Sequence, residues 1–119
     1  MDKVVVAEKF ERIAEFWSPR IVGELNGQQV RLVKLKGDFE WHHHDAEDEL
    51  FFVVKGQMIM KLRDRDVVVN PGEFIIVPRG VEHKPCAPEE AHVMLFEPAS
   101  TLNTGNARSE RTVENPERL

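Results

Sequence analysis

Short apolar stretches separated by turn residues recur along most of the chain, at intervals of about 8–12 residues. Asn26-Gly27 is the strongest of the turn signals, because both central positions of a tight hairpin need positive φ. Further turn residues are Gly56, Asn70-Pro71-Gly72 and Pro88-Glu89-Glu90. The strands expected between these turns span residues 21–25, 28–36, 50–55, 57–63, 67–69, 74–77, 84–87 and 91–97. This succession predicts an all-β sandwich or barrel.

One segment before the strands has the periodicity of a helix. Apolar residues recur at the helical spacing i, i+3, i+4 and i+7, namely Phe10, Ile13, Ala14 and Trp17. Mostly acidic residues occupy the other face, so the pattern predicts a helix over residues 7–17. Ser18-Pro19 should end it, since the residue before proline avoids helical geometry. We expect this helix to pack on the sheet.

The 119 residues suit a single domain with a core of its own. We expect an N-terminal segment over residues 1–19, a β-barrel over 20–98 and a polar C-terminal tail over 99–119, lying on the surface or frayed. A net charge of −5 without a basic cluster argues against a nucleic-acid partner.

The sequence shows neither the pattern of a signal peptide nor that of a membrane-spanning helix. The first residues carry acids and lack the apolar core of a signal peptide, and no apolar run approaches the ~18 residues of a membrane helix. Cys86 is the single cysteine, so no disulfide can form within the chain. These observations favour a cytoplasmic protein with no membrane partner.

The chemistry-bearing residues gather in two short segments. His42 and His44 are two positions apart, so on an extended strand their imidazoles point the same way and can converge on one ion. Glu49 begins the next apolar run and can add a carboxylate oxygen. Imidazole and carboxylate together suit Mn, Fe, Ni, Zn or Cu better than Ca or Mg.

Two stretches resemble the paired motifs of the cupin family. Residues 37–56 contain Gly37, then His42-x-His44, four residues, Glu49, six residues and Gly56. Residues 72–83 read Gly72, five residues, Pro78-x-Gly80, two residues and His83. The resemblance implies a cupin double-stranded β-helix, that is, a jelly-roll barrel, here with a short N-terminal helix.

The first motif departs from the family pattern at its glycine, and the second just after its histidine. Four residues rather than five separate Gly37 from His42, so the loop is shorter or this glycine has another role. Ala87 stands where the family has an asparagine, which removes a possible hydrogen bond near the site but no metal ligand.

By the same resemblance, His42, His44, Glu49 and His83 would bind one divalent transition-metal ion. Three neutral imidazoles and one carboxylate leave a net charge near +1, which attracts an anionic oxygen. Two functions follow as alternatives. The first is a metal-dependent enzyme acting on a small oxygenated acid or sugar, as an isomerase, decarboxylase or dioxygenase. The second is a non-catalytic, metal-dependent module that binds or senses a small molecule.

Strand alternation sorts the neighbours of the ligands. If Glu49 points into the barrel, so do Phe51 and Val53, while Leu50, Phe52 and Val54 face outwards. Because these outward residues are apolar too, another layer or a second subunit should cover them, and we expect a homodimer.

Several other residues have two interpretations. His43 and Trp41 should point away from the site. His92, Met58 and Met60 are either core or pocket wall, Cys86 is a buried inert thiol rather than a nucleophile, and Arg79 is either solvated or a partner for a substrate carboxylate. Glu40 is the sole suggestion for a general base.

Overall fold

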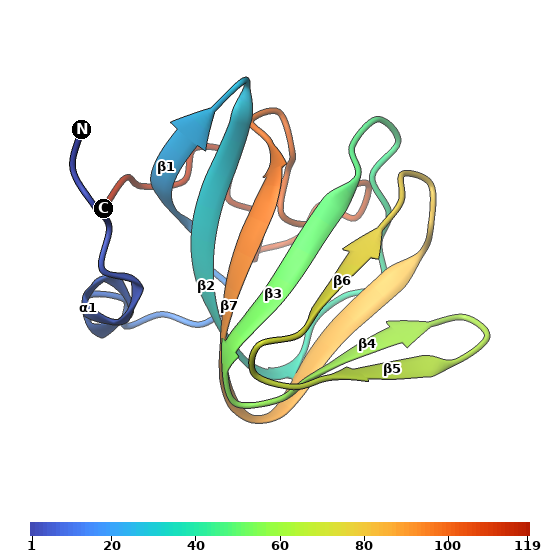
Figure 1. Cartoon of the computed structure of the whole chain (residues 1–119). Coiled ribbons are helices and arrows are strands. Elements are labelled where there is room, and N and C mark those ends of the chain that lie inside the picture. The colour runs from blue at the N-terminus through green and yellow to red at the C-terminus, as the bar shows by residue number, and fades with distance from the viewer.

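The computed structural model describes all 119 residues as a β-barrel with one short helix (Figure 1). Its elements are α1 (Val6–Glu11), β1 (Arg20–Leu25), β2 (Gln28–Asp38), β3 (Glu49–Lys55), β4 (Met58–Leu62), β5 (Asp66–Val69), β6 (Phe74–Val77) and β7 (His83–Pro98). The predicted all-β class is therefore confirmed. No helix has the length and apolar character needed to cross a membrane.

β7 is the strand around which the barrel is built. Its second half pairs antiparallel with β2 on one side and β3 on the other, giving the order β1-β2-β7-β3-β6. Its first half pairs with β4, which in turn pairs with β5. The two halves of β7 thus belong to the two walls of the barrel, which diverge in Figure 1.

The hairpin at Asn26-Gly27 forms as predicted. Both residues have positive φ, 51° and 76°, and Leu25 lies opposite Gln28. Gly56 also has positive φ, and a Cβ there would lie 2.6 Å from the carbonyl oxygen of Glu90. This glycine is therefore required by a close backbone approach as well as by the turn.

The two strands expected over residues 84–87 and 91–97 are one continuous strand, so this division was wrong. Pro88-Glu89-Glu90 is a bulge rather than a turn: Leu35 lies opposite Ala91 and Gly37 opposite Ala87, which leaves the three residues unpaired and exposed. The strand bends there as it passes from one wall to the other. Gly37, at φ 79°, takes part in this irregularity.

The helix is also shorter than predicted, since it ends at Glu11 instead of Trp17. Its apolar residues have two different destinations: Phe10 and Ile13 pack on the outer face of the sheet, whereas Trp17 enters the barrel core. No single helix face could reach both. Trp17 adopts φ 60°, and its backbone N–H and indole N–H donate to the carbonyls of Lys34 and Lys36.

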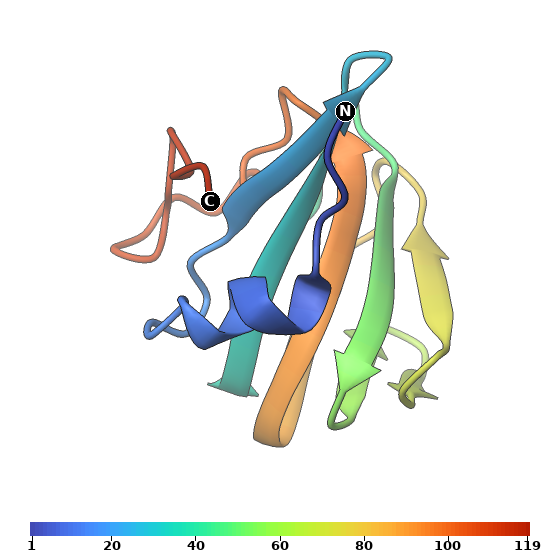
Figure 2. The same ribbon diagram turned by 60° about the vertical axis from the view of Figure 1, so that its left-hand side comes forward.

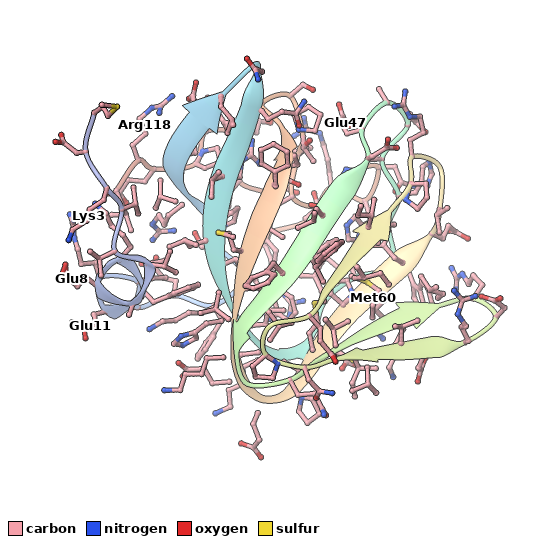
Figure 3. All side chains as sticks on the ribbon, viewed as in Figure 1. Lys3, Glu8, Glu11, Glu47, Met60 and Arg118 are labelled. Atoms are coloured by element: carbon pink, nitrogen blue, oxygen red, sulfur yellow. The ribbon has the colours of Figure 1, made fainter.

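Alternation along the strands builds an inner core and an outer apolar layer. Glu49, Phe51 and Val53 are buried inside, as parity predicted. Met58 and Met60 are fully buried, so they belong to the core, and Figure 3 shows Met60 in the space between the two walls. Outside, α1 crosses the sheet over β2 and β7 (Figure 2), with Glu8 and Glu11 turned to solvent (Figure 3).

The tail over residues 99–119 is ordered against the barrel. Its last residues run beside β1, where Ile21 N donates to Glu117 O and Leu119 N donates to Ile21 O, both at 2.9 Å. Thr101 and Thr104 are buried although polar. The low apolar content predicted a surface segment, and the structure adds that its backbone is fixed to the barrel by hydrogen bonds.

Candidate metal centre

Two separate parts of the chain bring the four predicted ligands to one end of the barrel. His42 and His44 lie in the connection between β2 and β3, whereas Glu49 and His83 are the first residues of β3 and β7. A pair of backbone hydrogen bonds joins His42 to His83, at 3.0 and 2.9 Å. Gly80 N donates to His44 O at 2.8 Å, which ties the second motif to the first.

The four side chains converge inside the protein. One ligand atom from each lies within 4.8 Å of the others. The ring centroids of His42 and His83 are 4.2 Å apart, and those of His42 and His44 are 5.1 Å apart. None of the four residues is more than 4% exposed. The structure therefore assembles the buried cluster of three histidines and one glutamate that the sequence predicted.

The hydrogen bonds around the cluster leave the correct nitrogens free. Nδ1 of His42 and Nδ1 of His83 each lie 2.9 Å from a backbone carbonyl, that of Glu40 and that of Val81. Because a carbonyl only accepts, both Nδ1 atoms must donate, so in the neutral rings Nε2 keeps its lone pair. The backbone thus orients both rings for binding through Nε2.

Three ligand atoms at the centre have no hydrogen-bond partner, although they are buried. They are His44 Nε2, Glu49 Oε1 and His83 Nε2. Glu49 Oε1 lies 3.2 Å from His44 Nε2 and 3.5 Å from His83 Nε2. Buried polar atoms without partners are costly, and a cation bound between them would satisfy all three.

The pKa values keep two ligands in the form that binds a cation. Burial and the neighbouring His83 lower the pKa of His42 to about 4, so the ring is neutral at neutral pH. Burial alone would raise the pKa of Glu49, but the neighbouring side chains of Glu97, His44 and His83 together hold it well below its usual range. Neutral imidazole and charged carboxylate are the states that a divalent transition metal requires.

A mostly apolar cavity adjoins the cluster. Its volume is about 40 Å³. His42 and Glu49 face it together with apolar side chains, among them Trp17, Phe39 and Phe51. Since one water requires roughly 10–15 Å³ of cavity volume, the cavity has room for about three waters. It can admit one small ligand directly beside the candidate ion.

The predicted neighbours mostly lie elsewhere. His43 points away and its Nε2 lies 2.9 Å from Asp45, as parity predicted. Arg63 stacks over Trp41 at 3.8 Å, which makes Trp41 a packing residue. Arg79 is exposed and its guanidinium contacts Asp48 at 3.2 Å, so it does not face the cavity. Glu40, suggested as a base, contacts Ser109 outside the cavity.

His92 and Cys86 are also accounted for by packing. His92 stacks on Phe10 with ring centroids 4.6 Å apart, under α1 on the outer face. The Cys86 thiol is buried, donates to Ile59 O and has its pKa raised by burial, which makes it a poor nucleophile.

Four residues at or near the site were missed by the sequence interpretation. The tail contributes Asn103 to the cavity, and Asn106 exchanges hydrogen bonds with the backbone of His43. Nothing in the composition of the tail signals this. Glu97 and Arg31 are buried near Glu49, and here a signal existed. Arg31 continues the alternating inward series of Val33 and Leu35, and Glu97 continues that of Val93 and Leu95.

The sequence profile of one family matches the chain. Residues 29–97, well over half of the chain, match the family described as "Cupin domain". The chain belongs to the cupin family. This confirms the resemblance carried by the two motifs, and the matched region contains all four residues of the cluster.

Solved structures and curated proteins agree with this assignment. A cupin-2 domain-containing protein from Shewanella frigidimarina NCIMB 400 is 41% identical, covers 80% of this cupin and 93% of its own chain, and superposes with a TM-score of 0.79. The uncharacterised protein YdbB of Bacillus subtilis is 33% identical over 64 residues, covering 53% of this chain and 57% of YdbB.

More distant relatives are dioxygenases. An acireductone dioxygenase of Bacillus licheniformis is 34% identical over 64 residues, and a 3-hydroxyanthranilate 3,4-dioxygenase of Brucella anthropi is 32% identical over 65 residues. The match covers 50% and 49% of this cupin but only 36% of each enzyme. The shared part is thus the cupin domain, and about two thirds of each enzyme lies outside it.

Proposed function

We propose that this cupin binds one divalent transition-metal ion through His42, His44, Glu49 and His83 and uses it in dioxygenase-type chemistry on a small substrate. The observation that carries the proposal is the set of buried, unpartnered ligand atoms, together with a cavity that adjoins two of the four ligand residues, His42 and Glu49. A bound ion would supply Lewis-acid or redox chemistry there. The protein's own residues orient the ligands and exclude bulk water.

The cavity supports dioxygen chemistry over isomerisation. Its only titratable lining residues are His42 and Glu49, and both belong to the ligand cluster. An isomerase that transfers a proton between carbon atoms needs a base besides the metal ligands. A dioxygenase would instead need the metal ion and dioxygen, and an apolar cavity wall is compatible with binding dioxygen. The two dioxygenase relatives support the same choice.

A non-catalytic binding module is the second candidate, favoured by the small volume of the cavity, about 40 Å³. Such a module would bind metal and ligand and return the ligand unchanged. Turnover distinguishes the two functions, whereas metal content does not.

The first experiment is elemental analysis of protein purified without a histidine tag. About one equivalent of Fe, Mn, Ni, Zn or Cu per chain is expected, lost in the His42→Ala/His83→Ala variant and retained in His43→Ala, whose ring points away from the cluster. If the folded protein neither contains metal nor takes it up, the four-ligand assignment is wrong.

Oxygen consumption then separates the enzyme from the binding module. The iron-loaded protein is assayed with 3-hydroxyanthranilate and with an acireductone as probes, beside the double variant. Dioxygen uptake that requires probe, iron and intact ligands supports the dioxygenase. Binding of a probe without uptake would favour the non-catalytic module.

A further inference from the structure

A second buried carboxyl group lies against the candidate metal ligand Glu49. Leu50 pairs with Phe96 and Phe51 with Leu95, and the same register places Glu49 opposite Glu97 on the neighbouring strand. Both side chains point inwards, where they are 3% and 1% exposed. Side chains directly opposite on antiparallel strands are in contact range, so the two carboxyl groups face each other away from solvent.

Arg31 fixes the far side of Glu97. Its guanidinium donates to Glu97 Oε1 at 3.1 Å, and the two side chains are 2% and 1% exposed. The remaining donors of Arg31 bond to Gln29 Oε1 at 2.9 Å and to the carbonyls of Thr101 and Ala99 at 2.8 and 3.1 Å. A planar guanidinium held at four points has one orientation, so Glu97 is held in one position as well.

The other oxygen of Glu97 faces the Glu49 carboxyl group. Glu97 Oε2 is buried and receives no hydrogen bond from any N–H donor, and the Glu49 carboxyl is its neighbour. Two buried carboxyl groups in contact need compensating charge. Arg31 supplies it to Glu97, and a cation bound by the three histidines and Glu49 would supply it to Glu49.

We propose that Glu97 is a positioning residue for Glu49: held by Arg31, it packs against the Glu49 carboxyl group and keeps Glu49 Oε1 aimed at the three imidazoles. The inference rests on the proposed metal function. Arg31 also connects the C-terminal tail to this arrangement, because the same guanidinium that holds Glu97 donates to the carbonyls of Ala99 and Thr101.

The test compares the dissociation constant and visible absorption spectrum of Co²⁺ in matched variants of the whole chain. Glu97→Gln keeps the shape of the side chain and an acceptor for Arg31, so its affinity for Co²⁺ should stay within about threefold of the wild type. Arg31→Met/Glu97→Met replaces the buried pair by apolar side chains, which folded proteins commonly tolerate. It should lose roughly 10–100-fold in affinity, as removal of outer ligand partners does, with an altered spectrum.

Two further variants complete the experiment. Arg20→Met removes another largely buried arginine, whose partners are Glu15 and Glu117, and should leave Co²⁺ binding unchanged. Glu97→Asp withdraws the carboxyl group by one methylene and should weaken binding about tenfold, which gives a measurement if the double methionine variant does not fold.

The outcomes separate the two proposals. Wild-type affinity and spectrum in Arg31→Met/Glu97→Met, or in Glu97→Asp, would overturn the positioning role while leaving the metal site intact. A loss in Glu97→Gln as large as in the double variant would overturn the positioning role in favour of an effect of the Glu97 charge. A wild-type protein that does not bind Co²⁺ would instead overturn the metal function itself.

Discussion

The inner and outer faces of the wall formed by β2, β7, β3 and β6 have opposite and unexpected compositions. Inside, near the histidines, Glu49, Glu97 and Arg31 are almost completely buried. Outside, Phe74 and Ile76 are 58% and 53% exposed, beside the half-buried Phe52. Charged groups are rarely buried without partners, and large exposed apolar areas usually mark contact surfaces.

The contrast shows that the residue composition of each face matches what is expected to contact it. The inner charges lie where a cation and hydrogen bonds can satisfy them, which costs less than leaving them unpaired. The outer apolar residues need a cover, and α1 provides it for only part of the sheet, over Leu32 and Met94. Phe74 and Ile76 on β6 remain exposed within the single chain, so we propose that a second copy covers them in a homodimer.

The sharpest way to test this contrast is one substitution at two consecutive residues of β3. Phe51→Ala removes an inner side chain that is 6% exposed and should lower the unfolding free energy by about 3–5 kcal/mol. Phe52→Ala removes the same atoms from the half-buried outer face, and the loss should be about 1–2 kcal/mol. Urea unfolding of both variants measures the difference, and equal losses would show that the faces are equally packed.

Acidification should weaken the inner face of the metal-free protein. The pKa of His42 is about 4 when folded and 6.5 in its ordinary state, so between these values the unfolded chain takes up a proton that the folded one refuses. The unfolding free energy of the metal-free protein is therefore not reduced by His42 above pH 6.5, and it falls as the pH is lowered to about 4. The total reduction is roughly 3 kcal/mol.

Urea unfolding at several pH values, with chelator present, measures this effect. His42→Gln is the matched control, because its side chain does not titrate and the slope between pH 6.5 and pH 4 should flatten. An identical slope in the control would assign the pH dependence to other groups.

Substitution of the exposed outer residues should have the smallest effect on folding. Phe74→Lys/Ile76→Lys should change the unfolding free energy of the monomer by no more than about 0.5 kcal/mol, yet it should convert a dimer into a monomer in analytical ultracentrifugation. Val68→Lys, at a 49% exposed apolar residue of β5, is the control and should leave association unchanged. A monomeric wild-type protein would contradict the proposed dimer.

The local spacing of residues predicted the site better than it predicted how distant strand segments pair and continue. Strand parity pointed to His42 and His44, and the resemblance to the two cupin motifs added Glu49 and His83 as ligands. The same reasoning placed His43 and Trp41 away from the cluster and Phe51 inside. It failed at Pro88-Glu89-Glu90, where a turn composition hid a bulge in one long strand.

The end of α1 shows why local patterns have limits. The periodicity through Trp17 was real, but the barrel core competes for this side chain, and its burial against Phe39, with ring centroids 4.8 Å apart, outweighs continuation of the helix. Propensity is a weak preference that tertiary contacts override. The sequence alone does not state which contact wins.

By itself, the sequence determined the strand alternation and the Asn26-Gly27 hairpin, because each depends on residues a few positions apart, and the resemblance to the paired cupin motifs supplied the four candidate ligands. Only the tertiary structure decided that Glu97 lies opposite Glu49, that Arg31 holds it, and that the tail contributes Asn103 to the cavity. These neighbours are set by strand register and by packing between distant segments. Such pairings form only when the whole barrel closes.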